Sequence, residues 1–306
     1  MGTNTPATHT DRPLAAAAYM ICAMAIIGVI DNFIAPLSQH IGLWQFHLIR
    51  TLFALPLVAM FSLLGLGTLF PNRFWAVALR SLLVAISMLF YFSALAMMPI
   101  AQALAGLFTS PIFILLITSG IMKRRIGPWR VLAVGFGFIG IILVLQPNPA
   151  DFDWSIFVPI CAGFFYALGA ISTRSLCSGE STVALLAGML ITLGILGAIG
   201  SITLVIFPVW QPGDEVQFFS RPWEWSMQKA LPLLLLQAVG SICGVFMIIK
   251  SYQLGEPSYV SVFEYSVMIF GPVYAWFAFG QPVQGWQILG IAFIALAGII
   301  IAVRSR

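Results

Sequence analysis

The stretch TVALLAGMLITLGILGAIGSITLVIF, residues 182–207, contains no charged side chain. A helix rises 1.5 Å per residue, so about 20 apolar residues cross the hydrocarbon core of a bilayer, which is about 30 Å thick. The stretch is too long and too continuously apolar for the alternating pattern of a membrane β-strand. It therefore predicts a helix that crosses a lipid bilayer.

The composition of the whole chain agrees with that stretch. The chain has 306 residues, of which 60% are apolar and 8% are charged. Soluble domains are about 45–50% apolar and about 25% charged. So few charged side chains cannot cover a globule of this size, which excludes an ordinary soluble enzyme, and the apolar content excludes a disordered chain. We expect an all-α integral membrane protein whose main partner is the lipid bilayer.

Ten stretches are long and apolar enough to be transmembrane helices. They are 14–36, 44–66, 74–96, 99–121, 128–146, 155–176, 182–207, 229–251, 257–279 and 284–303. Proline lies mostly at their junctions, and within a span it removes a backbone hydrogen bond and can bend the helix. The prolines inside predicted spans are Pro36, Pro56, Pro111, Pro159, Pro232 and Pro272.

Lysine and arginine are distributed unevenly between the two sides of this arrangement. With ten spans both chain ends share one side, which then carries Arg12, Arg73, Lys123, Arg124, Arg125, Arg130, Arg174, Lys250, Arg304 and Arg306. The other side has only Arg221 and Lys229 in its longest loop. The excess of positive charge predicts that the N- and C-termini are cytoplasmic, in a plasma (bacterial inner) membrane. The basic run 123–125 is an orientation signal on this interpretation, and we expect no nucleic-acid partner.

Two parts of the chain resemble each other. Around residues 94–146 and 252–304, each contains a short junction ending in proline (Pro99, Pro257), a mid-helix proline (Pro111, Pro272) and a final helix opening at tryptophan (Trp129, Trp286). Five helices per unit is an odd number, so the two units would enter the membrane in opposite senses. The sequence thus predicts ten transmembrane helices arranged as two inverted five-helix repeats.

The predicted organisation is a cytoplasmic tail (1–13), a first repeat (14–146), a linker (147–154), a second repeat (155–303) and a short tail (304–306). Two inverted halves can exchange conformations, so that a cavity open to one side has an equivalent state open to the other. This is the architecture of alternating access, and it predicts a secondary transporter.

Several short motifs resemble one family in their order and spacing. They are Gly28-x-x-x-Asn32-Phe33, Arg50 within LIRTLFALPL, the run YFSALAMMPIAQALAGLFTSPIF at 91–113, and Tyr166-Ala167. Together they make the chain similar to the drug/metabolite transporter superfamily, of the ten-helix EamA type. The resemblance implies export of amino-acid-like or other amphipathic metabolites.

Other functions remain as alternatives: an uptake permease for a small metabolite, a channel, or an intramembrane enzyme that modifies lipids. Metalloprotease, hydrolase and P-loop motifs are all missing, so we expect no enzyme, no metal and no cofactor. Without an ATP-binding loop, transport must be passive or driven by a gradient, with protons as one candidate coupling ion. The sequence indicates no oligomeric state.

Charged residues within predicted spans are costly and are therefore candidates for function. Asp31 lies about 7–8 Å from the outer end of the first span, and Arg50 about 9 Å inside the second. Equal depth favours an ion pair, which, with Asn32, either fixes helix packing or forms a charged wall of the substrate cavity. His47 lies one turn from Arg50 and is a weaker candidate.

Glu264 is the second candidate, about 10 Å from the cytoplasmic start of the ninth span. A carboxyl group buried at low dielectric can hold a proton at neutral pH. The hypotheses are a structural carboxyl paired with Arg80 or Lys250, or a group that binds a cationic substrate or the coupling proton. The remaining candidates for substrate binding are Tyr91, Tyr166 and Tyr265. Polar positions such as Ser110, Gln237, Ser241 and Tyr252 could also face inward.

Overall fold

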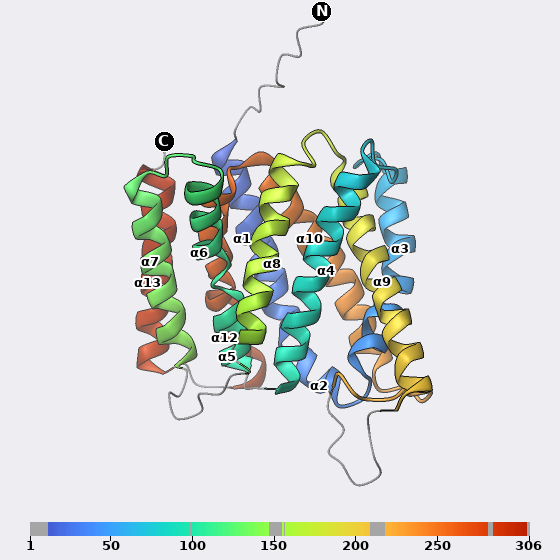
Figure 1. The fold of residues 1–306 in the computed structure, drawn as a ribbon. Helices are drawn as coiled ribbons and strands as arrows, with labels where there is room; N and C mark the ends of the chain where they lie inside the picture. Colours follow the sequence, from blue (N-terminus) through green and yellow to red (C-terminus); the bar gives the residue numbers. More distant parts are fainter. Residues whose placement is uncertain are drawn as a thin grey trace, which may run out of the picture.

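The computed structural model describes residues 12–97, 100–146, 155, 157–208, 218–280 and 284–304. These residues form α-helices joined by short loops (Figure 1). The helices are α1 (Pro13–Asp31), α2 (Ile34–Ser38), α3 (Leu43–Leu63), α4 (Phe74–Met97), α5 (Ile100–Leu107), α6 (Ser110–Leu116), α7 (Pro128–Leu145), α8 (Phe157–Ser175), α9 (Thr182–Ile206), α10 (Leu231–Leu254), α11 (Pro257–Val260), α12 (Val267–Phe279) and α13 (Gly285–Arg304). The predicted linker 147–154 and most of the two predicted tails lie outside the described residues.

Within the described residues, eight helical segments are long and apolar enough to cross a membrane. Two further apolar helices, Ser110–Ile121 and Pro128–Val144, are shorter. The prediction of an all-α membrane protein is therefore confirmed, whereas the count of ten spans stays a prediction.

Three of the predicted continuous spans are interrupted. The first ends at Asp31, and α2 begins after a break at Asn32 and Phe33. The fourth breaks between α5 and α6, where Pro111 opens the new helix because it has no backbone N–H to donate to the preceding turn. The ninth contains a 3₁₀ turn at Ser261–Ser266, whereas its proline, Pro272, lies inside the regular helix α12. Mid-span proline thus marks the interruption of the fourth span but not that of the ninth.

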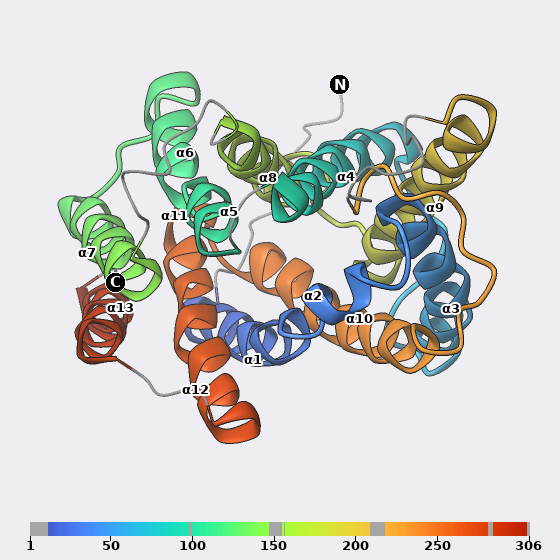
Figure 2. The ribbon, with the colours of Figure 1, turned by 90° about the horizontal axis from the view of Figure 1, so that it is seen from below.

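The helices on the two sides of the predicted linker pair with each other in a regular way. Helix α1 packs against α10 and α12, and α8 packs against α4, α5 and α6. Helix α3 packs along α9 and also contacts α10, while α9 also contacts α4. Helices α7 and α13 form a separate pair, which lies at one edge of the molecule when seen from below (Figure 2). If α1 is exchanged for α8, α3 for α9, α4 for α10, α5 and α6 for α11 and α12, and α7 for α13, these pairings map onto one another, whereas the additional contacts of α10 with α8 and α9 have no counterpart of similar extent.

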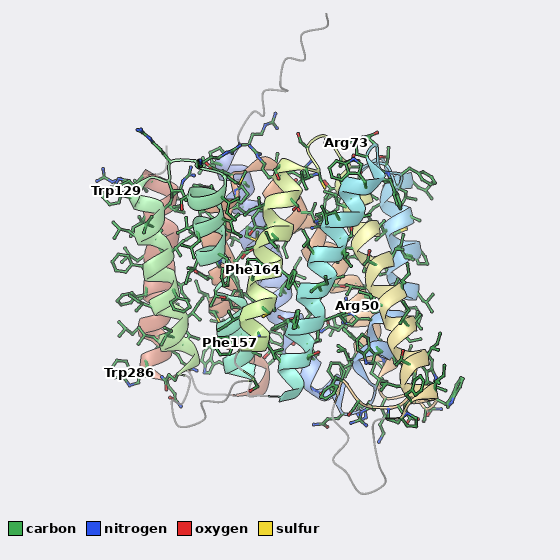
Figure 3. All side chains as sticks on the ribbon, in the orientation of Figure 1. Arg50, Arg73, Trp129, Phe157, Phe164 and Trp286 are labelled. Atoms are coloured by element: carbon green, nitrogen blue, oxygen red, sulfur yellow. The ribbon has the colours of Figure 1, made fainter. Side chains whose placement is uncertain are left out.

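Basic side chains gather at the end of the molecule where α1 begins and α13 ends. Arg73 donates to the backbone carbonyl of Ser178, which lies in the other half of the chain. Arg174, near the end of α8, donates to the backbone carbonyl of Gln253 in α10. Arg304 lies 5.1 Å from the centre of the Trp129 ring. Figure 3 shows Arg73 and Trp129 at this end and Trp286 at the opposite end. The basic residues named here therefore share one side, as the charge pattern predicted.

The outer surface of the bundle is apolar, as a lipid-facing surface must be (Figure 3). Helix α9 illustrates this, because both of its faces carry aliphatic side chains. Leu185, Leu186, Leu190 and Leu193 are buried, while Ile191, Ile195, Ile199 and Ile202 are exposed. Burial in this protein is consequently decided by helix packing and not by a separation of polar and apolar faces.

Close packing between α7 and α13 depends on glycine. A Cβ atom at Gly140 would lie 2.7 Å from the carbonyl oxygen of Gly290, and one at Gly290 would lie 2.6 Å from that of Gly140. Small residues at a crossing let helix backbones approach within the membrane, where packing replaces the hydrophobic effect between helices.

Gly140→Val should therefore push α7 and α13 apart and destabilise the fold by about 1–3 kcal/mol, the usual cost of overpacking. Gly135→Val on the same helix is the matched control, because a Cβ at Gly135 has no neighbour within 4 Å. The thermal unfolding midpoints of both variants in detergent, compared with the parent, provide the check. Equal midpoints for the two variants would contradict this account of the crossing.

Candidate functional site

A cavity of about 140 Å³ lies between the helices. Each long helix around it contributes side chains spaced three or four residues apart, which is one face of a helix. Helix α1 contributes Met24, Ile27 and Asp31; α4 contributes Arg80, Val84, Met88 and Tyr91; α8 contributes Tyr166, Ala170 and Thr173; α10 contributes Gln237, Ser241, Val245, Ile248 and Tyr252. The cavity is therefore lined by helices from both sides of the predicted linker.

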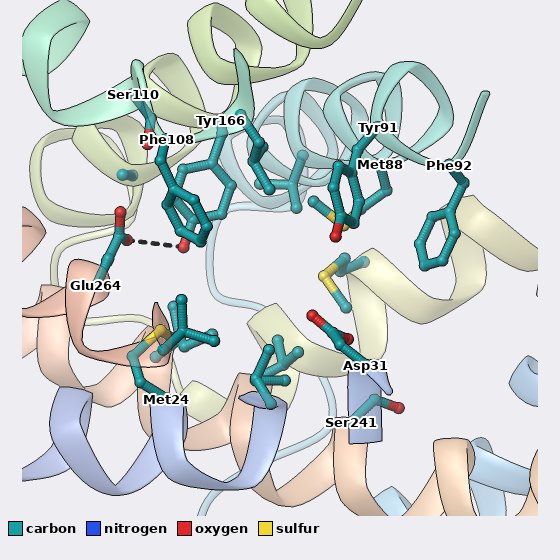
Figure 4. Close-up of a pocket in the computed structure, with 18 of the residues that line it drawn as sticks. Met24, Asp31, Met88, Tyr91, Phe92, Phe108, Ser110, Tyr166, Ser241 and Glu264 are labelled. Atoms are coloured by element: carbon teal, nitrogen blue, oxygen red, sulfur yellow. Dashed lines mark hydrogen bonds between the residues drawn. The ribbon is translucent and has the colours of Figure 1, made fainter. Parts of the chain in front are cut away.

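Glu264 lies at one end of this cavity and is 2% exposed (Figure 4). It belongs to the 3₁₀ turn 261–266, which interrupts the regular helix and so gives this carboxyl its place at the cavity. The hydroxyl groups of Tyr166 and Tyr252 donate to its Oε1 atom at 2.9 Å and 2.5 Å. Ser110 also faces the carboxyl, but the Oε2 atom has no partner with the geometry of a hydrogen bond. One oxygen of the carboxyl is thus held by two tyrosines and the other is available.

Arg80 lines the same cavity but does not pair with Glu264. Its Nε atom donates to Thr173 Oγ1 at 2.9 Å, and its Nη1 atom donates to the carbonyl of Leu185 at 3.3 Å. The ion pairs within 4.0 Å among the described residues are Arg73–Glu180 and Arg130–Glu256. Of the hypotheses for Glu264, the pairing with Arg80 or Lys250 is therefore wrong, because tyrosine hydroxyls are the partners of this carboxyl.

Asp31 and Arg50 lie together at the other end of the cavity, where Figure 4 shows Asp31 opposite Tyr91. They interact electrostatically but are further apart than the 4.0 Å of an ion pair. Arg50 instead donates from Nη2 to Nδ1 of His47 at 3.2 Å, and its guanidinium lies 4.8 Å from the centre of the Phe46 ring. Asp31 and Arg50 therefore both line the cavity but do not form the ion pair that their equal depth favoured.

Apolar side chains separate these two charged ends. Met24, Met88 and Met189 line the cavity together with Phe92 and Phe108. Methionine is flexible and polarisable and adapts to ligands of irregular shape. The cavity can therefore hold an apolar body between two polar ends.

Six of the eight predicted site residues line the cavity: Asp31, Arg50, Arg80, Tyr91, Tyr166 and Glu264. The other two do not. Asn32 donates from Nδ2 to the carbonyl of Gly28 at 2.7 Å, within its own helix end. Tyr265 is fully buried and packs against Gly137 and Phe108.

Tyr252 and Thr173 are contributors that the sequence did not single out. Tyr252 appeared there only among several polar positions, because a single sequence does not show which face of a helix is turned inward. The pattern Gln237, Ser241 and Tyr252 on one face of α10 was the available signal. No sequence pattern pointed to Thr173, because its role appears only through its contact with Arg80.

Comparisons with known proteins identify the family of the chain. The model of the EamA-like transporter family matches residues 14–146 and 153–304. A riboflavin transporter of Rhizobium johnstonii is 25% identical over 302 residues, covering 96% of this chain and 93% of its own. A riboflavin transporter of Vibrio cholerae is 26% identical, covering 93% and 92%. An S-adenosylmethionine uptake transporter of Rickettsia prowazekii is 25% identical, covering 71% and 68%.

A solved crystal structure supports the fold. It superposes with a TM-score of 0.72 and 15% sequence identity, covering 93% of this chain and 94% of its own. At that identity the similarity concerns the arrangement of the helices alone.

The contact between Arg80 and Thr173 can be tested through stability. Thr173→Val keeps the shape of the side chain but removes the acceptor for a buried, charged donor, so we expect a loss of about 1.5–3 kcal/mol. Thr203→Val is the control, because Thr203 is exposed and donates only to the carbonyl of Ile199 in its own helix. Thermal unfolding in detergent should show a lower midpoint for Thr173→Val than for Thr203→Val. The reverse order would mean that Arg80 does not depend on Thr173.

Proposed function

The chain belongs to the EamA-like transporter family and is a membrane transporter, not an enzyme, and we propose that it is a secondary active carrier of small amphipathic metabolites working by alternating access. The observation that carries the proposal is the cavity, which is lined by helices from both sides of the predicted linker and has a buried carboxyl at one end. The apolar body and polar ends of that cavity suit an amphipathic solute.

Ten spans in two inverted repeats are part of the proposal. It is supported by the main helix pairings, because the contact of α1 with α10 corresponds to that of α8 with α4, and the contact of α3 with α10 corresponds to that of α9 with α4. In such an arrangement the contacts that close one side of the cavity have equivalents that close the other. The contacts of Gln45 with Glu224 at one end, and of Arg130 with Glu256 at the other, both join the two halves.

Orientation and direction complete the proposal. The shared end of basic residues supports cytoplasmic termini in a bacterial inner membrane. Export is the direction that the family resemblance implied. Uptake is the second candidate, and it is favoured by the names of the Rickettsia relatives, which are S-adenosylmethionine uptake transporters. Riboflavin and S-adenosylmethionine are both small metabolites with a ring system and polar groups, which makes them suitable first probes.

Glu264 is proposed as the coupling group. An ionised carboxylate buried without a counter-charge is costly, so a proton or a cation is expected to neutralise it during the transport cycle. A carboxyl that takes up a proton when the cavity faces one side, and releases it when the cavity faces the other, couples solute movement to the proton gradient.

Proteoliposomes loaded with riboflavin or S-adenosylmethionine test the function. A carrier should show saturable flux and counterflow, and an imposed pH gradient in either direction should reveal export or uptake. Flux that does not saturate and shows no counterflow would indicate a channel instead.

Glu264→Gln keeps the shape of the side chain but cannot titrate, so gradient-driven flux should fall at least about tenfold while solute exchange survives. Glu224→Gln is the control, because the side chain of Glu224 is exposed and accepts from the backbone N–H of Ser226, while the contact of Glu224 with Gln45 uses its backbone atoms and survives the substitution. If Glu264→Gln folds and pumps like the parent, another group couples transport, and Asp31 is the next candidate.

A further inference from the structure

We propose that the Glu264 end of the cavity is a binding site for an organic cation, an ammonium or sulfonium group attached to an apolar body. The inference rests on the proposed transport function and names the substrate class for the same cavity. Three features of the structure support it: the available carboxylate oxygen, the aromatic rings around it, and the placement of the other charges.

The available oxygen is Oε2 of Glu264. The side chain is 2% exposed and its Oε1 atom already accepts from Tyr166 and Tyr252, whereas Oε2 has only the Ser110 hydroxyl near the carboxyl and no partner with the geometry of a hydrogen bond. A buried acceptor without a partner costs free energy, which a ligand that supplies the missing interaction recovers. Because Oε1 is held by two hydroxyl groups, the carboxyl is fixed with Oε2 as its free atom.

Aromatic rings surround this carboxyl. The rings of Tyr166 and Tyr252 line the cavity and reach Glu264 through their hydroxyl groups. Phe108 lines the same end, since its ring lies 6.4 Å from that of Tyr265, the residue that follows Glu264 (Figure 4). A cation over such ring faces is attracted to their negative charge, which is the chemistry by which aromatic cages bind quaternary ammonium groups.

The other charges favour the Glu264 end over the Asp31 end. Asp31 interacts with Arg50, so its charge is already balanced in part. Arg80 directs two of its nitrogen atoms to Thr173 and Leu185 and forms no ion pair with Glu264. A small metal ion is a poor alternative, because the described residues contain no group of three acidic, histidine or cysteine side chains that could coordinate it.

The site also explains how cargo and proton could exchange. A cation and a proton cannot both neutralise the same carboxylate, so binding of one displaces the other. The transported solute would then carry its positive group at Glu264 and place its apolar body along Met24 and Met88.

A binding measurement that needs no transport tests the inference. Purified full-length protein in detergent is titrated calorimetrically with benzyltrimethylammonium and with its uncharged carbon isostere, 2,2-dimethyl-1-phenylpropane. We expect the cation to bind at least about tenfold more tightly than the isostere, and Glu264→Gln to lose that preference. Tyr166→Phe keeps the ring but loses one of the two hydroxyl groups that fix Oε1, so it should weaken cation binding, and Tyr166→Ala, which loses the ring as well, should weaken it further.

Tyr265→Phe is the matched control, because the Tyr265 hydroxyl has no hydrogen-bond partner and the side chain does not line the cavity. Its affinity should equal that of the parent. Equal affinities of the parent for cation and isostere would overturn the inference, and this comparison needs no variant to fold. Tight cation binding by a protein that carries no solute would contradict the transport function alone. Saturable flux without charge preference would contradict the cation site alone.

Discussion

A carboxyl group buried among membrane helices is the constraint on which the rest of this structure depends. Lipid offers no water to solvate Glu264, so the protein must supply hydrogen bonds or a neutralising partner. It supplies two tyrosine hydroxyls from different helices, Tyr166 on α8 and Tyr252 on α10, both to one oxygen. The 3₁₀ turn 261–266 and the stripe of cavity residues on each surrounding helix are the means by which the fold places this group.

In the carrier proposed above, the remainder of the bundle has to let that group face the two sides of the membrane in turn. Helix α7 crosses α13 closely at Gly140 and Gly290, which makes a compact pair beside the helices that line the cavity. Around the cavity itself, α1 with α10 and α4 with α8 form equivalent pairings. If the two halves are the inverted repeats proposed above, equivalent contacts have similar free energies, and two conformations in which the halves exchange roles are close in stability. That balance is what alternating access requires.

The sequence predicted the membrane class, the positions of the apolar helices and the four charged residues that line the cavity, because the cost of burying charge in lipid is visible in a single sequence. It did not predict the partners of those residues. Depth along a helix placed Asp31 beside Arg50 and Glu264 beside Arg80, but depth does not specify the direction in which a side chain points. Asn32 and Tyr265, which were also candidates, do not line the cavity. Tyr252 and Thr173 could be recognised only from contacts between helices that are distant in the chain.

Sided labelling of one cavity residue tests the account most directly. Ser241 is small, buried and lines the cavity, so Ser241→Cys in a chain lacking Cys22, Cys161, Cys177 and Cys243 gives a single reporter thiol. A small membrane-impermeant thiol reagent is applied to right-side-out and to inside-out vesicles. The account predicts that the introduced thiol reacts from both sides, and that an imposed gradient of solute or protons shifts its reactivity from one side toward the other. Reaction from one side only, whatever gradient is applied, would contradict a cavity with alternating access.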